Sequence, residues 1–175
     1  MSMPTHRRIY LRLSNINSIL IVVSILCMSI FLVVPSNASV QVFAKQFTAT
    51  MLGGNEVPPV NTNASGYGSF RTAANNTLLK YRVNMTGLSN VTGAQIHQGI
   101  AGQNGDTIVD LWNDSKKNTG KLATVIRGNI TDTDLTGPMK GKILDAFLAV
   151  LRAGNTYVNI NTSSHPEGEI RGQIK

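Results

Sequence analysis

The sequence predicts an all-β domain, a Greek-key β-sandwich or flattened barrel with one short helix, on three observations. Beyond residue 45, apolar and polar residues alternate in short runs, the pattern of strands with one buried face. Turn residues such as Asn and Gly separate the runs about every 8 to 12 residues, as in sandwiches and barrels. Only one segment, near residues 139–152, has apolar residues at helical spacing instead.

The predicted strands follow from this alternation. The clearest is residues 79–85, where apolar side chains at odd positions alternate with polar ones at even positions. The Asn104-Gly105 pair predicts a reversal before the strand that follows it, because both residues tolerate positive φ. The other predicted strands are residues 47–51, 66–73, 92–97, 107–112, 121–130, 157–162 and 169–174.

The alternating runs at residues 157–162 and 169–174 predict a hairpin at the end of the chain. A polar loop that contains Pro166 and Gly168 separates them. In the final run, Glu169 and Arg171 share one face while Ile170 lies on the other, since side chains alternate along a strand. We therefore expect this end of the chain to be paired into the sheet.

The helix prediction covers residues 139–152 and depends on its end signals. Pro138 suits the first turn, Arg152 the last turn and Gly154 the position after the end. Gly141 would cost about 1 kcal/mol inside a helix, which favours a later start.

Residues 1–44 have the composition of a secretory signal. Three Arg precede an apolar run at residues 19–34, and small residues follow at Ala38 and Ala44. We expect cleavage after one of these two alanines, and cleavage after Ala44 leaves residues 45–175 as the exported domain. The alternative is an uncleaved membrane anchor, although this run of sixteen residues is slightly shorter than the roughly 20 residues that span a bilayer.

Charge and cysteine content narrow the function classes. Residues 45–175 contain thirteen Lys and Arg against nine acidic residues, scattered along the chain. Nucleic-acid binding is not expected, because no basic run is interleaved with aromatic residues. The single cysteine, Cys27, lies in the N-terminal segment, so we expect a core without disulfides.

Asparagine sequons also indicate export. Eight N-x-S/T triplets occur in the chain, one of them, at Asn37, inside the N-terminal segment. The alternative is a composition rich in short polar residues. The predicted glycosylation sites are Asn63, Asn75, Asn84, Asn90, Asn113, Asn129 and Asn161.

Catalytic motifs are not apparent in residues 45–175. The segment has two His and no Cys, so neither a Cys-His pair nor a Ser-His-Asp set can be argued from it. It also has no glycine-rich phosphate loop followed by a helix and a Lys. We expect neither an enzyme nor a cofactor.

Three motifs carry a family resemblance: GGNEVPPV at residues 53–60, GAQIHQGIAGQNG at residues 93–105 and YVNINTSSHPEGEIRGQI at residues 157–174. In this order and spacing they resemble the CHRD domain, a module named after the animal protein chordin and also found in microbial secreted proteins. The resemblance implies an extracellular sandwich of immunoglobulin-like or superoxide-dismutase-like fold. The motif residues expected to be structural are Glu56, Pro58, Pro59, His97, Gly99, Gly168, Glu169, Arg171 and Gly172.

Two of these motifs suggest specific roles. The segment around Glu56 is rigid because Pro58 and Pro59 fix φ and lack donors, so it is either a presented binding edge or a fixed crossover. We also expect Arg171 to pair with Glu169 or Glu56 in a partly buried clamp. The alternative is that all three are ordinary surface charges.

His97 is the candidate for metal chemistry. Members of the family that the motifs resemble commonly carry His-x-His where this chain has Gln95-Ile96-His97, and amides are poor ligands for copper or zinc. Members of the same family also commonly carry His-Thr where this chain has Asn161-Thr162. His165, four positions beyond Asn161 in a loop, is the other weak candidate. A single strand histidine is more often structural than a ligand, so no metal is expected.

These observations favour a non-enzymatic binding or structural module, secreted or at the cell surface. Its partner would be an extracellular protein or a component of the cell envelope, with membrane contact only through an uncleaved N-terminal segment. The alternative is a metal-binding or dismutase-like metalloprotein that uses His97, which rests on fold analogy.

Overall fold

The computed structural model describes residues 44–73, 75–113 and 124–175. The predicted signal at residues 1–44 lies almost wholly outside them, as do positions 121–123 of one predicted strand. In the described part of the chain, no helix is long and apolar enough to cross a membrane.

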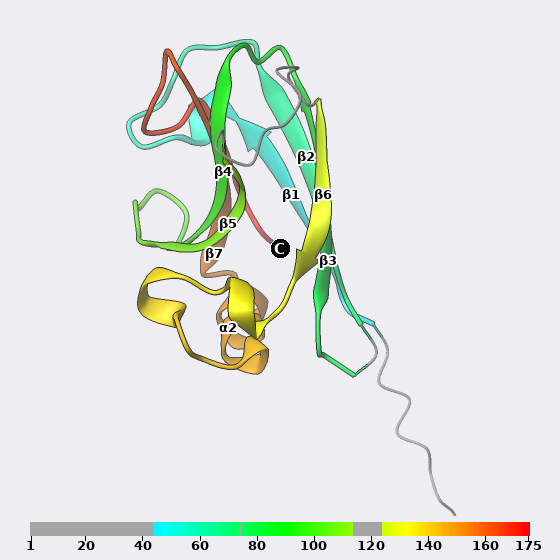
Figure 1. The fold of residues 1–175 in the computed structure, drawn as a ribbon. Helices are drawn as coiled ribbons and strands as arrows, with labels where there is room; N and C mark the ends of the chain where they lie inside the picture. The colour runs from blue at the N-terminus through cyan, green and yellow to red at the C-terminus, as the bar shows by residue number, and fades with distance from the viewer. Residues whose placement is uncertain (1–43, 74, 114–123) are drawn as a thin grey trace, which may run out of the picture. The chain divides into compact units, whose positions relative to one another are not determined.

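The described strands form one antiparallel eight-stranded sheet, as the alternation predicts (Figure 1). Their order in the sheet is β5-β4-β7-β8-β1-β2-β3-β6. Neighbours that are not consecutive in the chain, such as β4 and β7, are typical of Greek-key connections. The strands are β1 Gln46–Leu52, β2 Ser65–Thr72, β3 Leu79–Thr86, β4 Val91–Gln98, β5 Thr107–Asn113, β6 Val125–Ile130, β7 Thr156–Thr162 and β8 Ile170–Gln173.

The sheet folds over into two layers and is nearly closed. Figure 1 shows β4, β5 and β7 on one side, β1, β2, β3 and β6 on the other, and the helix at one end. The edge strands β5 and β6 approach each other. In addition, the hydroxyl of Tyr81, on the strand β3 beside β6, donates to the carbonyl of Leu111 on β5 across 2.8 Å. The flattened barrel predicted from the alternating runs is therefore confirmed.

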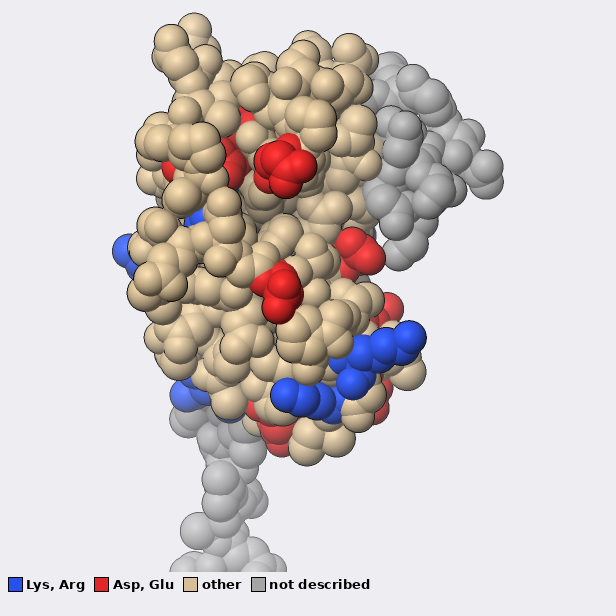
Figure 2. Space-filling view, turned by 90° about the vertical axis from the view of Figure 1, so that its left-hand side faces the viewer, with Lys and Arg blue, Asp and Glu red and all other residues tan. Residues whose placement is uncertain are grey.

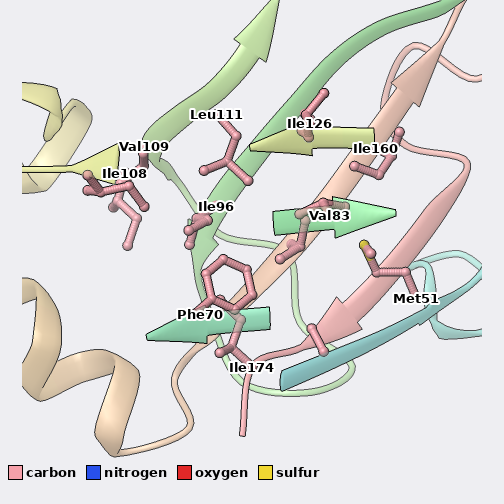
Figure 3. Packing of buried hydrophobic residues seen from close by; sticks show 14 of the residues in the cluster. Met51, Phe70, Val83, Ile96, Ile108, Val109, Leu111, Ile126, Ile160 and Ile174 are labelled. Atoms are coloured by element: carbon pink, nitrogen blue, oxygen red, sulfur yellow. The ribbon is translucent and has the colours of Figure 1, made fainter. Parts of the chain in front are cut away.

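The core fills the space between the layers. Ala49 and Met51 of β1 and Ile96 of β4 are buried there, and each strand contributes its apolar face (Figure 3). Side chains of alternate positions point inward because the strand period is two. At about 25 cal/mol per Å² of buried apolar surface, this packing is the main stabilising term.

The helix is shorter than the sequence predicts. Helix α2 spans Leu144–Arg152, and a separate 3₁₀ turn, Gly137–Met139, precedes it. Gly141 lies between them with φ +76°, a left-handed conformation that an α-helix cannot include. The helix therefore starts after residue 139, in the direction that the cost of Gly141 favours. Helix α2 lies at one end of the barrel (Figure 1), and its buried residues, among them Phe147 and Leu148, belong to the apolar core.

The predicted C-terminal hairpin is confirmed. Strands β7 and β8 pair with Tyr157 opposite Gln173 and Asn159 opposite Arg171. Strand β8 then continues the sheet to β1, where Leu52 lies opposite Arg171. The end of the chain is held further by two hydrogen bonds between the backbones of Thr48 and Lys175.

Candidate functional site

The motif residues meet on the outer face of strands β4, β7 and β8. His97 lies opposite Tyr157, which lies opposite Gln173, and Asn159 lies opposite Arg171. These five side chains, which we call the polar layer, alternate with core residues and therefore point away from the barrel interior. The outer face of an antiparallel sheet, opposite the core, would normally be in contact with water.

Three loops nevertheless cover the polar layer: three of its side chains are buried, and His97 and Gln173 are half-buried. Tyr157 is 2% exposed, Asn159 5% and Arg171 2%. The covering loops are residues 53–60, residues 99–105 and residues 163–168, and side chains of the polar layer donate hydrogen bonds to two of them. The chain thus has a second interior, which is polar, outside the apolar core.

Arg171 anchors the loop of residues 99–105. Its guanidinium donates to Asn104 Oδ1 at 2.9 Å and to the carbonyls of Ile100 and Gln103 at 3.1 and 2.6 Å. Its Cζ lies 3.4 Å from the centroid of the Tyr157 ring, which adds a cation–π contact. A buried guanidinium needs this set of acceptors, because burial removes the water that would otherwise solvate it.

The expected clamp between Arg171 and a carboxylate is wrong. In the described structure the guanidinium bonds to neutral oxygens of the loop at residues 99–105. Glu169 instead accepts hydrogen bonds from Thr62 at 2.9 Å and Thr162 at 2.7 Å. Sequence spacing placed Glu169 and Arg171 on one face, but it could not show that Arg171 binds the loop at residues 99–105 while Glu169 binds Thr62 and Thr162.

Asn104 connects two of the covering loops. Its Oδ1 accepts from Arg171, and its Nδ2 donates to the carbonyl of Val57 at 2.8 Å. Strand β8 thereby holds the loop at residues 53–60 through Asn104, and a second link is direct, since Asn55 Nδ2 donates to the carbonyl of Arg171 at 3.0 Å. Pro58 and Pro59 lie outside any strand and are exposed, as expected for residues without backbone donors.

His97 is held in one tautomer. Its Nδ1 lies 2.9 Å from the carbonyl of Gly105, and since a carbonyl only accepts, Nδ1 carries the proton and Nε2 carries the lone pair. The ring stacks on Tyr157 with centroids 5.0 Å apart and planes 9° apart. Burial lowers the pKa of His97, against the opposing effect of the Gly105 hydrogen bond. His97 Nε2 is buried without a hydrogen-bond partner.

Glu56 is a buried carboxylate. It is 7% exposed, and its Oε1 has no hydrogen-bond partner. Burial raises the pKa of Glu56 to about 7, while the charge of Arg171 acts in the opposite direction. Its carboxyl group therefore changes charge near neutral pH, unlike an ordinary surface glutamate.

Two of the motif glycines are required by close approach. Gly168 has φ +144°, and a Cβ there would overlap the Asn159 amide and lie 2.7 Å from Glu56 Oε1. A Cβ at Gly172 would lie 2.6 Å from the carbonyl oxygen of Thr50 on β1. Gly99 has a different role: its carbonyl accepts from Gln173 Nε2 at 2.8 Å.

Two hollows border the polar layer. The small cavity, of about 360 Å³, is lined by residues that include Glu56, Pro58, His97, Asn159, His165 and Glu167. The large groove, of about 690 Å³, runs along β1 and β8. Its walls include Thr50, Val57, Pro59, Ala101, Arg171 and Gln173. Glu56 borders both hollows.

The two weak metal candidates come together in the small cavity. His97 and His165 both line it, although they are far apart in the sequence. The described residues contain no group of three or more His, Cys, Asp or Glu side chains placed to hold a metal ion. The geometry therefore gives the metalloprotein alternative no ligand set within the described part of the chain.

The predicted glycosylation sites differ in exposure. The exposed ones are Asn63, Asn75, Asn90 and Asn129, and Asn84 is half-buried. Asn161 is also half-buried, and its Nδ2, where a sugar would be attached, donates to the carbonyl of Pro166 at 2.6 Å. The side chain of Asn113 lies outside the described part. Occupancy of all these sites remains a prediction.

Sequence reasoning assigned no functional role to four residues of this site: Asn104, Tyr157, Asn159 and Gln173. All four lie inside the recognised motifs. Alternation along β7 gave a usable signal, because it places Tyr157 and Asn159 on the face opposite Val158. Asn104 was interpreted only as a turn residue, and nothing local indicates its contact with Arg171, 67 positions away.

Comparison with known proteins agrees with the three motifs. The family model described as CHRD domain matches residues 47–174. No curated protein and no solved structure matches the chain.

Proposed function

Because the chain belongs to the CHRD domain family over residues 47–174, we propose that it is a non-enzymatic binding module, secreted or held at the cell surface. CHRD domains occur in extracellular proteins, and the signal-like segment and the sequons support export. The partner is an extracellular protein or a component of the cell envelope.

The observation that carries the proposal is the large groove. One of its walls is the outer face of β1 and β8, and the other is made by the covering loops at residues 53–60 and 99–105. The motif residues fix those loops: Arg171 and Gln173 donate to the carbonyls of Gln103 and Gly99, and Asn104 holds Val57. The polar groups of the motifs thus shape a recessed surface, which suits recognition of a partner.

The hydrogen bonding of the motif residues supports a non-catalytic role. The donor groups of Arg171 are directed to loop oxygens, and both carboxylate oxygens of Glu169 accept from threonines. The hydrogen bonds of Arg171 hold the backbone of the loop at residues 99–105 in place, and those of Glu169 fix the two threonines. The family is in general a non-catalytic one.

A matched pair of substitutions tests the groove. Ala101 lines it on an exposed loop, and Ala149 is exposed on α2 outside it. Fluorescently labelled protein should bind saturably to intact cells of the source organism. Ala101→Arg should weaken this binding at least about tenfold by filling the groove, a loss typical of an interface hot spot, while Ala149→Arg should leave it unchanged. Equal binding by both variants would reject the groove as the contact surface.

Export has its own test. N-terminal sequencing of the protein recovered from the medium or the cell surface should start at Lys45 or Ser39, the residues after the two candidate cleavage sites. Recovery of the protein only from the cell interior would contradict the proposed location.

A further inference from the structure

The small cavity gathers acceptor atoms that have no donor among the described residues. Glu56 Oε1, His97 Nε2 and Asn159 Oδ1 are each buried without a hydrogen-bond partner, and all three residues line this cavity. Buried polar atoms are nearly always paired, so three such atoms at one place require an explanation. Glu56 and Asn159 are 7% and 5% exposed.

The protein itself fixes each of these atoms as an acceptor. Asn159 uses its Nδ2 to donate to the carbonyl of Glu167 at 2.7 Å, which directs Oδ1 elsewhere. His97 uses its Nδ1 proton on Gly105, which leaves a lone pair on Nε2. The oxygens of Glu56 and Asn159 also converge, since a Cβ at Gly168 would be in contact with both.

We propose that the small cavity binds a primary ammonium group, carried by a lysine side chain of a partner polypeptide or by a free small amine. An ammonium has three N–H donors, one for each acceptor, and its charge complements a carboxylate. This inference deepens the binding role proposed above, and it depends on that role only for the claim that a partner carries the group.

The described residues that line the small cavity include two carboxylates, Glu56 and Glu167, and no Lys or Arg, which suits a cation. The donor groups of Arg171 are bound to the loop at residues 99–105, and Arg171 does not line the cavity. Burial raises the pKa of Glu56 to about 7, and the charge of Arg171 acts in the opposite direction, toward the ionised form. Figure 2 shows the side of the molecule on which the loops at residues 99–105 and 163–168 lie. Acidic side chains stand out there on a mostly uncharged surface, with Lys and Arg toward the left edge and the bottom.

A metal ion fits the same atoms less well. The three acceptors include one charged group and a neutral amide, and amides are poor ligands for zinc and copper. The described residues offer no cluster of three metal-binding side chains. A cavity of about 360 Å³ is also much larger than a bare ion needs.

The test uses protein purified after expression of the full chain, titrated calorimetrically at pH 8, where Glu56 is ionised. The probes are propylammonium, Nα-acetyl-lysine amide and tetramethylammonium. Propylammonium and the lysine compound should bind saturably. Tetramethylammonium, which has the charge but no N–H, should not bind. Tighter binding of the lysine compound identifies a partner polypeptide as the source, and tighter binding of propylammonium identifies a free amine.

Glu56→Gln should weaken propylammonium binding at least about tenfold, the effect of a lost charge-assisted hydrogen bond. Glu167→Gln makes the same change at the exposed rim of the cavity and should alter binding about twofold or less. Thermal melts establish that both variants are folded. The ¹⁵N resonance of His97 Nε2 should shift on titration, a signature that a purely structural Glu56 would not produce.

Three results would overturn the inference. The first is the absence of saturable propylammonium binding, which means that water alone fills the cavity. The second is an equal loss of propylammonium affinity in Glu56→Gln and Glu167→Gln, and the third is Zn²⁺ binding that is tighter than propylammonium binding and is lost in His97→Ala. Cell-surface binding that is sensitive to Ala101→Arg, without ammonium binding, rejects only the inference. Ammonium binding without cell-surface binding rejects the proposed module and retains the amine site.

Discussion

The guanidinium of Arg171 lies over the ring of Tyr157, with 3.4 Å between Cζ and the ring centroid, and both side chains are 2% exposed. The two residues come from neighbouring strands, on the face opposite the apolar core. Their stacking makes the outer face of the sheet a second packed interior. The first prediction concerns what this interior contributes to stability.

Arg171→Ala should lower the free energy of unfolding by about 3–5 kcal/mol, measured by urea denaturation. The substitution removes three part-buried hydrogen bonds from a charged group to Asn104 and two carbonyls, a kind of bond that is typically worth about 1.5–3 kcal/mol, and it removes the cation–π contact with Tyr157. Arg71→Ala, at an exposed position on β2, should change stability by about 0.5 kcal/mol or less. Equal losses in the two variants would mean that Arg171 behaves as a surface charge.

Asn104→Ala should reduce the local stability of the loop at residues 53–60. It removes the hydrogen bond to the carbonyl of Val57 and one acceptor of Arg171. The amide of Val60, which bonds to the carbonyl of Gly53, should then exchange its hydrogen about five- to tenfold faster, the effect of losing about 1 kcal/mol of local stability. Unchanged exchange at Val60, in a protein that remains folded, would show that the segment is held by other contacts.

The ionisation of Glu56 should make stability fall as pH rises. Its pKa is about 7 in the folded state, against a usual 4.5, so the folded state binds more protons between these values. Stability is then lost across pH 4.5 to 7, by about 2–3 kcal/mol.

Comparison with Glu56→Gln isolates this effect. Other groups at the cavity also titrate or carry charge, namely His97, His165, Glu167 and, nearby, Arg171. The lowered pKa of His97 acts in the opposite direction, costing stability only as pH falls below about 6.5. The difference in unfolding free energy between wild type and Glu56→Gln should therefore change between pH 5 and pH 8. A difference that is constant with pH would mean an ordinary pKa for Glu56.

His97 should remain neutral to lower pH than a free histidine. Burial lowers the pKa of the ring, and Nδ1 is engaged by Gly105. NMR titration of the ring protons should place the midpoint below 6.5, and the ¹⁵N shifts should show the Nδ1-protonated tautomer. A midpoint above 6.5 would indicate an anionic neighbour stronger than the burial effect.

Gly168→Ala should destabilise the fold by about 2–3 kcal/mol in urea denaturation. The residue has φ +144°, and its Cβ would overlap the Asn159 amide, so strain and overlap act together. Gly54→Ala is the control. A Cβ there meets nothing within 4 Å, and its stability should change by about 0.5 kcal/mol or less. If the two variants have the same free energy of unfolding, the loop at residues 163–168 adapts to the added methyl group.

The strands were predictable because alternation is local. Residues 79–85 and 157–162 show it clearly, and the structure has strands Leu79–Thr86 and Thr156–Thr162 there. The start of the helix was not predictable to the residue. Helical spacing extends back to Ile143, but the chain reaches α2 through a 3₁₀ turn and the left-handed Gly141.

The sequence by itself determined the two-faced strands, the terminal hairpin and the family motifs, because strand period and turn chemistry are properties of neighbouring residues. Only the tertiary structure decided that the polar face is buried, that Arg171 binds a loop at residues 99–105 in place of a carboxylate, and that Glu56 meets Asn159 at Gly168. Those contacts join residues 67 or more positions apart. Closure of loops over a sheet depends on long-range packing, which leaves no periodic signal in the chain.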